Sequence, residues 1–126
     1  QLFHSAAGDE PLHLYLLLVA ASVGLSAFID NIPYVAAMLP VVQGVAALMN
    51  GGAGIEPELF YFGLLTGATL GGNLTPIGAS ANIAAIGILR KHGEQVRTRD
   101  FLRIGIPFTL AAVLTGYVYL WLVWGA

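Results

Sequence analysis

Two polar, helix-breaking tracts interrupt an otherwise apolar sequence, and they constrain the possible folds more than any other feature. The first tract is Asp30-Asn31-Ile32-Pro33, and the second runs from Gly71 to Asn82 and reads GGNLTPIGASAN. Lipid cannot hydrogen-bond to exposed backbone, so non-helical backbone at membrane depth is tolerated only where protein buries it or a water-filled cavity solvates it. Two such breaks in one short chain indicate a binding site within a transporter.

The composition excludes most soluble classes of protein. Of the 126 residues, 57% are hydrophobic and only 10% are charged, whereas about 25% are charged in an ordinary soluble domain. The lack of cysteine excludes a disulfide framework. The net charge of −2 does not indicate a nucleic-acid-binding protein, which would carry an excess of basic residues. The sequence has no Ser/His/Asp set, metal-ligand spacing or phosphate-binding loop, so we expect neither an enzyme nor a resident cofactor. Because the chain begins with Gln1, we expect a piece of a longer protein.

The basic residues predict how the chain is oriented in the membrane. All five fall in one short stretch and are Arg90, Lys91, Arg97, Arg99 and Arg103. The positive-inside rule places such a stretch in the cytoplasm. We therefore expect residues 93–103 to form a cytoplasmic loop of an integral protein of the cell (plasma or inner) membrane, with the C-terminus outside.

Residues 12–49 predict a helical hairpin whose tip is the first polar tract. Its first arm, residues 12–29, would reach roughly 27 Å as a helix, which is marginal for a full span. At the tip, Asn31 suits a helix N-cap and Pro33 suits the first turn of the second arm, in which Pro40 predicts a kink. If the basic loop is cytoplasmic, the hairpin begins and ends on the outer side of the membrane. We favour a re-entrant hairpin over two full spans joined by a small cytoplasmic turn, because the tip has no Lys or Arg.

The charge-free run that follows is too long for one ordinary span, and it predicts a discontinuous helix over residues 59–92. The position of the polar tract divides it into a half-helix over about 59–71, an unwound stretch over about 72–80 and a half-helix over about 81–92.

The remaining segments complete an all-α integral membrane fold. Residues 50–58 predict a turn-rich loop. Residues 104–124 predict a plain transmembrane helix that ends in interfacial tryptophans. Within the first half-helix, Gly63, Gly67 and Gly71 share one face and permit close helix packing. The predicted fold is thus a re-entrant helical hairpin, a broken transmembrane helix and a plain transmembrane helix.

The two breaks offer ligands for an ion. A half-helix that starts within the membrane presents unpaired N–H groups and a positive dipole end, so two converging starts near Asn31 and Ser80 would form an anion site. The preceding half-helices end in unpaired carbonyls near Ile29 and Gly72. Neutral oxygens suit Na⁺, and the nearby side chains that could supply more of them are Ser26, Asn31, Asn73 and Thr75.

Asp30 is the ionisable residue within the apolar stretches. A charge at bilayer depth costs about 2.5–3.5 kcal/mol on insertion scales, and such residues usually mark ion or proton paths. Asp30 therefore suits proton or cation exchange, although it would also serve as a turn cap or reach water at a loop. The other polar side chains have a structural alternative as well, which is to satisfy backbone groups freed at the breaks. This alternative applies to Ser26, Asn73, Thr75, Ser80 and Asn82.

Three segments carry a resemblance to a known group of transporters. They read LSAFIDNIPYVAAMLPVV, GGNLTPIGASANIAAIGILRKHG and FLRIGIPFTLAAVLTGYVYLWL. Over residues 12–124 the chain resembles the ion-transporter superfamily, which includes ArsB-type arsenite permeases, NhaD-type sodium/proton antiporters, pink-eyed-dilution-type proteins, citrate-transporter-like permeases and divalent anion/sodium symporters. The resemblance implies that residues 1–126 are the C-terminal of two inverted repeats. It also implies an ion site between the two tips, half of it supplied by the N-terminal repeat, and a homodimer.

The resemblance also assigns individual residues. Asn31 matches the Ser-Asn-Thr motif at the hairpin tip of the sodium/dicarboxylate branch, while Asp30 and Ile32 depart from it. The sequence Asp-Asn-Ile-Pro looks more like the arsenite-permease, NhaD and pink-eyed-dilution branch. Ser26 matches a hydroxyl position that helps to bind sodium. The matches in the broken helix are Thr75-Pro76-Ile77-Gly78 in its loop, and Ser80 and Asn82 near the start of the half-helix that follows.

We therefore expect an ion-coupled secondary transporter that performs cation- or proton-coupled ion exchange, with Na⁺ or H⁺ as the coupling ion. The alternative is an anion permease for a citrate- or dicarboxylate-like substrate or for arsenite efflux. A channel, a structural membrane subunit and a membrane enzyme are weaker readings. The expected ion or substrate ligands are Ser26, Asp30, Asn31, Asn73, Thr75, Gly78, Ser80 and Asn82, with Na⁺ at Ser26 and Asn31. The residues expected to shape the breaks are Pro33, Gly72 and Pro76.

Overall fold

In a computed structural model of the chain, residues 11–49 and 57–125 are described, and all their regular structure is helical. The predicted loop 50–58 lies outside the described residues apart from its last two positions. The helices, in chain order, are α2 (Pro11–Ser26), α3 (Asn31–Met49), α4 (Glu58–Gly71), α5 (Ser80–Lys91) and α6 (Thr98–Trp124). The predicted all-α class is confirmed for the described part of the chain.

The core lies where α2 packs against α4 through the predicted glycine face. A Cβ on Gly63 would lie 2.6 Å from the ring of Tyr15, and a Cβ on Gly71 would lie 2.6 Å from the carbonyl oxygen of Val23. The contact at Gly67 is similarly close, at 2.9 Å from the backbone of α2. No side chain larger than hydrogen fits these gaps without movement, so the glycines set the distance between the two helices.

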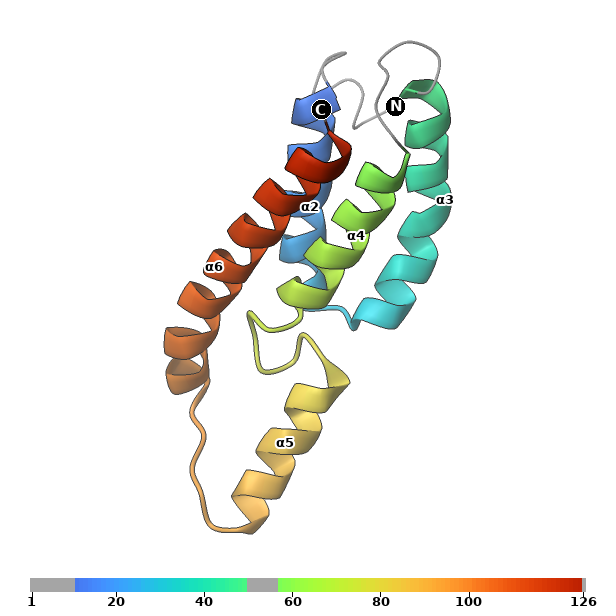
Figure 1. The fold of residues 1–126 in the computed structure, drawn as a ribbon. Helices are drawn as coiled ribbons and strands as arrows, with labels where there is room; N and C mark the ends of the chain where they lie inside the picture. Colours follow the sequence, from blue (N-terminus) through green and yellow to red (C-terminus); the bar gives the residue numbers. More distant parts are fainter. Residues whose placement is uncertain (1–10, 50–56, 126) are drawn as a thin grey trace.

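Aromatic side chains join α6 to this core at the end of the molecule that holds the start of α2. The ring of Tyr15 stacks on Tyr117, with ring centroids 5.0 Å apart, and on Trp121 at 5.9 Å. Phe62 of α4 contacts Trp124, with centroids 4.9 Å apart. The two tryptophans thus lie at the end of α6, away from the basic residues (Figure 1).

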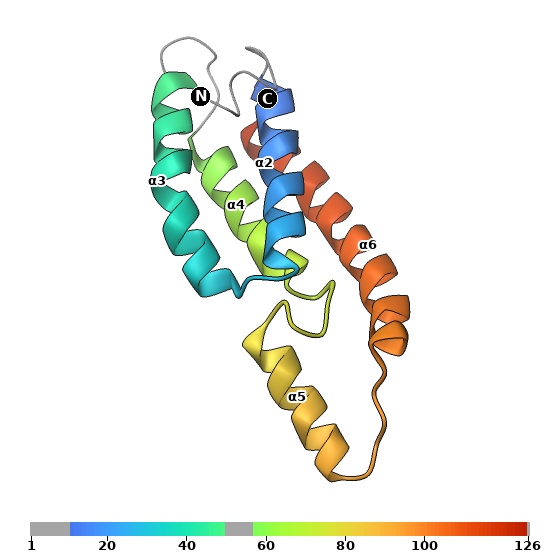
Figure 2. The same ribbon diagram turned by 180° about the vertical axis from the view of Figure 1, so that it is seen from behind.

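The hairpin turn and the break between α4 and α5 lie side by side. Figures 1 and 2 show the turn between α2 and α3 next to the connection between α4 and α5, partway along the molecule. From this level α5 extends away from the bundle and past the start of α6, whereas α6 lies along the side of the bundle. At 1.5 Å per residue, α2 is roughly 24 Å long and α6 roughly 40 Å. The hairpin thus turns well short of the far end of α6.

Two boundaries differ from the sequence-based expectation. Helix α6 begins at Thr98, before the expected start at residue 104, so the predicted loop 93–103 is largely replaced by the first turns of a helix. Basic residues mark where a chain leaves lipid but do not end a helix, and Asp100 in the first turn complements the helix dipole. Helix α2 ends at Ser26 rather than at 29, because the following residues form the turn that contacts the break.

The surface of the bundle fits a bilayer. The stretches Asn31–Leu48 of α3 and Thr98–Trp124 of α6 are long and apolar enough to cross a membrane. Only 17% and 11% of these stretches are buried, so neither is the core helix of a soluble fold. Large apolar side chains such as Leu48, Phe108 and Leu122 face outward, and soluble monomers rarely expose contiguous apolar surface of this extent. This arrangement supports a membrane protein.

Candidate functional site

The hairpin tip and the helix break contact each other directly. The hydroxyl of Thr75 donates a hydrogen bond to the carbonyl oxygen of Ala27 in the hairpin turn. A Cβ on Gly78 would lie 2.8 Å from the same oxygen, so only glycine allows this approach. On the other side of the turn, a Cβ on Gly72 would lie 3.3 Å from Oδ1 of Asn31. The two polar tracts, far apart in the sequence, therefore form one junction.

Ser26 ties the end of α2 to the end of α4. Its side chain is fully buried, and its hydroxyl donates to the carbonyl oxygen of Ala68 at 2.5 Å. That carbonyl also accepts a bond from the backbone N–H of Gly72, at 3.4 Å. Because the one hydroxyl proton is engaged, the Ser26 oxygen can offer only its lone pairs to a ligand.

Asn82 holds the unwound stretch closed. Its side-chain amide donates to the carbonyl oxygens of Gly72 at 2.9 Å and Thr75 at 3.1 Å. These carbonyls are freed because the helix is interrupted between Gly71 and Ser80. Thr75 and Asn82 thus donate to carbonyls at the turn and the break, as the structural alternative for these residues supposes, whereas Ser26 adds a second donor to the Ala68 carbonyl. The Oδ1 oxygen of Asn82 makes none of these bonds.

Asn31 differs from these residues. Its Oδ1 atom is buried and has no hydrogen-bond partner among the described residues. The oxygen lies at the start of α3, where the first helical bond runs from the N–H of Tyr34 to the carbonyl of Asp30. The N–H groups of Asn31 and Ile32 precede that bond. A buried polar atom without a partner costs about 1–3 kcal/mol, and in native proteins such an atom usually marks a bound water, an ion or a functional strain.

The Asp30 side chain is half-buried in the same turn, directly before α3. No hydrogen bond or ion pair engages its carboxylate within the described residues. The five basic residues lie at the other end of α5 and at the start of α6. The positive end of the α3 dipole is the favourable neighbour that the fold provides for this carboxylate.

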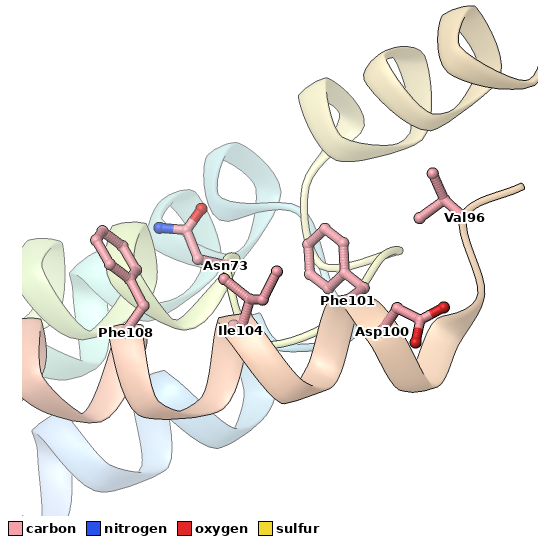
Figure 3. A pocket seen from close by; sticks show the side chains of 7 residues that line it. Asn73, Val96, Asp100, Phe101, Ile104 and Phe108 are labelled. Carbon is pink, nitrogen blue, oxygen red and sulfur yellow. The ribbon is translucent and has the colours of Figure 1, made fainter. Parts of the chain in front are cut away.

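The side chains of two predicted ligands, Asn73 and Ser80, form no hydrogen bond with the hairpin tip. The backbone of Asn73 packs on α6, where a Cβ on Gly105 would lie 2.7 Å from its carbonyl oxygen. The Asn73 side chain lines a hollow of about 380 Å³ beside α6 (Figure 3). Ser80 is the first residue of α5 and is exposed. Pro33 lies in the first turn of α3 and Pro76 in the unwound stretch, where both were expected.

The structure shows buried hydroxyl groups that were not singled out from the sequence. Tyr34 donates from its hydroxyl to Oγ of Ser22 at 3.1 Å, which ties the two hairpin arms together inside the bundle. Thr109 of α6 is fully buried, and its hydroxyl has no partner among the described residues. In the sequence, Ser22, Tyr34 and Thr109 each appear as a single hydroxyl within an apolar run. Such a pattern does not distinguish a hydroxyl that contacts another helix from one that bonds to its own helix.

Comparisons with known proteins agree with a membrane transporter. The chain is 41% identical over 115 residues to an uncharacterized transporter from Mycobacterium tuberculosis (strain H37Rv), which covers 91% of this chain and 26% of the relative. It is 36% identical over 115 residues to a 46 kDa membrane protein from Mycobacterium leprae, over 91% of this chain and 26% of the relative. It is 38% identical over 105 residues to the human P protein, covering 83% of this chain and 12% of the relative.

The chain therefore spans about a quarter of the length of the first of these curated relatives. No family profile matches the chain, and no solved structure is significantly similar to it. One of these relatives is named as an uncharacterized transporter and another as a membrane protein, which supports the expectation that this chain is part of a membrane transporter rather than of an enzyme. Similarity to the P protein agrees with the pink-eyed-dilution group among the transporters that the sequence resembles.

Proposed function

We propose that the chain is the C-terminal half of an ion-coupled secondary transporter and that the ion binds where the hairpin tip meets the helix break. The observation that carries this proposal is the buried, unpartnered Oδ1 of Asn31 at that junction. An amide oxygen is a suitable Na⁺ ligand, and this one lies beside Gly72 of the helix break. Broken helices in membranes commonly surround transport sites.

In this proposal the hairpin supplies the ligands that this chain contributes. Asn31 contributes its free oxygen, and Ser26 contributes the lone pairs of a hydroxyl whose proton is already directed at Ala68. The remaining ligands come from an N-terminal repeat outside this chain, related to it as the second inverted half. The hairpin is re-entrant from outside, and residues 92–97 face the cytoplasm.

Asp30 couples the ion to protons in this scheme. A carboxylate beside the site attracts the cation while it is ionised and releases it when it is protonated, so binding of Na⁺ and of H⁺ exclude each other. Movement of the hairpin and break relative to the rest of the transporter then exposes the site to either side in turn. The protein makes and breaks no covalent bond other than that of the proton on Asp30.

One observation favours the alternative of an anion permease. Two helices start at the junction, since α3 begins at Asn31 and α5 begins at Ser80, and Gly72 lies between these starts. The N–H groups and dipoles of two helix N-termini attract anions. A citrate- or dicarboxylate-like anion or arsenite would then be the substrate, and ionised Asp30 would oppose a dianion by repulsion.

The test uses the full-length parent protein in proteoliposomes that contain a pH-sensitive dye. An imposed Na⁺ gradient should change the internal pH with wild-type protein, and Asp30→Asn should abolish that change. Glu58→Gln is the matched control, because Glu58 is an exposed acid in the first turn of α4, at the other end of the bundle. A wild-type protein that moves no protons would overturn the exchanger, and uptake of labelled citrate and arsenite would then test the anion permease.

A further inference from the structure

The basic residues form a cluster that the ion site does not use. Arg90 and Lys91 close the last turn of α5, Arg97 precedes α6, and Arg99 and Arg103 lie in its first turns. All five are exposed, and none forms an ion pair within the described part of the chain. Glu94 and Asp100 are the acids in the same stretch, so the formal charge, five positive and two negative, is +3.

A hollow beside this cluster continues into an apolar groove. The first hollow, of about 410 Å³, is lined by Arg90, Gly93, Glu94, Gln95 and Val96. Gly93 has φ +86°, a conformation that favours glycine, and it turns the chain at the end of α5. Val96 also lines the second hollow, of about 380 Å³, so the two adjoin there.

The surface of the second hollow is mainly apolar, and Asn73 and Asp100 are the polar residues that line it. Figure 3 shows Phe101, Ile104 and Phe108 projecting from the same side of α6, with Val96 at one end of the hollow and Asn73 near the other. The residues from Asp100 to Phe108 cover roughly 12 Å along the helix axis. The groove thus leads from the basic cluster toward the middle of the molecule.

A molecule that fits both hollows has an anionic head and an apolar tail. We propose that the two adjoining hollows beside the start of α6 bind one anionic glycerophospholipid of the cytoplasmic leaflet. Its phosphate lies among the basic residues near Arg90, and an acyl chain lies along Phe101, Ile104 and Phe108. The cytoplasmic leaflet carries anionic lipids, and basic residues next to a membrane-spanning helix attract them. The proposal uses the orientation proposed above but not the ion site.

Spin-labelled lipids test this proposal with the full-length parent protein in lipid nanodiscs. Electron paramagnetic resonance measures the fraction of motionally restricted chains for phosphatidylglycerol and for phosphatidylcholine, each labelled on the acyl chain. Wild-type protein should restrict phosphatidylglycerol preferentially. That preference should fall roughly fivefold for each basic residue neutralised, as in Arg90→Gln and Lys91→Gln, whereas Arg90→Lys should retain it. Equal restriction of both lipids by wild-type protein would overturn the proposal.

A second pair of variants separates a bound lipid from a merely basic surface. Ile104→Trp fills the groove without changing the charge, and it should remove the restricted phosphatidylglycerol signal. Leu114→Trp is the matched control, because Leu114 is an exposed residue of the same helix that does not line the groove. An unchanged signal in Ile104→Trp would mean that other parts of the transporter fill the groove, and the proposal would then be wrong. Neither variant touches the junction, so a failure here is distinct from a failure of ion exchange.

Discussion

At the scale of single residues, the polar side chains of the junction fall into two groups: those that hydrogen-bond to backbone carbonyls, and Asn31, whose oxygen has no hydrogen-bond donor in the part of the chain that the structure describes. Ser26, Thr75 and Asn82 donate to backbone carbonyls at the ends of α2 and α4 and in the break. Asn31 instead keeps a buried oxygen that no donor satisfies within the described residues. Since an unpaired buried oxygen costs free energy, the difference marks Asn31 as the residue whose oxygen is free for a ligand, while Thr75 and Asn82 hold the site together and Ser26 can do both.

The role of Thr75 in holding the site together predicts the effect of removing its hydroxyl. Thr75→Val keeps the shape of the side chain but leaves the Ala27 carbonyl without its partner. We expect the free energy of unfolding to fall by about 1–3 kcal/mol, which a thermal-unfolding series of the full-length protein in detergent would detect. Thr75→Ser keeps a hydroxyl and should lose less. Equal stability of Thr75→Val and wild type would show that this bond does not hold the junction together.

At the scale of helices, the glycine face of α4 determines how closely α2 approaches. A Cβ on Gly71 would lie 2.6 Å from the Val23 carbonyl oxygen, and this backbone atom cannot rotate away. Gly71→Ala should therefore cost about 1–3 kcal/mol by overpacking. Gly87→Ala is the control, because nothing lies within 4 Å of its Cβ position on α5, and the better helix propensity should make it neutral or stabilising. Similar melting temperatures for the two variants would contradict the packing described here.

Sequence periodicity and turn chemistry predicted most of these elements. The break was expected over 72–80 and spans 72–79, because its glycines and Pro76 are incompatible with a continuous helix. The early start of α6 was not predicted, because charged residues at the membrane surface are compatible with a helix that extends into water as well as with a loop. Which polar side chains meet was not predictable either, because the sequence does not show that Asn73 turns toward α6 while Thr75 reaches the hairpin.

At the scale of the whole molecule, the hairpin turn lies level with the helix break rather than with the far end of α6 (Figures 1 and 2). A re-entrant hairpin and two full spans differ in where the tip meets water. Because this chain contains no cysteine, single cysteines introduced into a cysteine-free parent can report that position. The tip residue Ile32 is 81% exposed in this chain and is the natural site.

We expect Glu94→Cys to react with a bulky, membrane-impermeant maleimide only from the cytoplasmic side. Ile32→Cys should be protected from that side, because a re-entrant tip stops within the bilayer. Gly125→Cys should react from outside. Strong cytoplasmic labelling of Ile32→Cys would instead indicate two full spans, and outside labelling of Glu94→Cys would invert the orientation.

Sodium binding to the full-length protein with Asn31→Leu tests the ion site most directly. This substitution removes the unpaired oxygen but keeps a side chain of similar size. Radioactive ²²Na⁺ binding should weaken by at least about tenfold, equivalent to about 1.4 kcal/mol. The melting temperature should rise with Na⁺ in wild type but not in the variant, and without Na⁺ the variant should be at least as stable, since no buried oxygen is then left unpaired. Equal Na⁺ binding by both proteins would contradict an ion site at the hairpin tip.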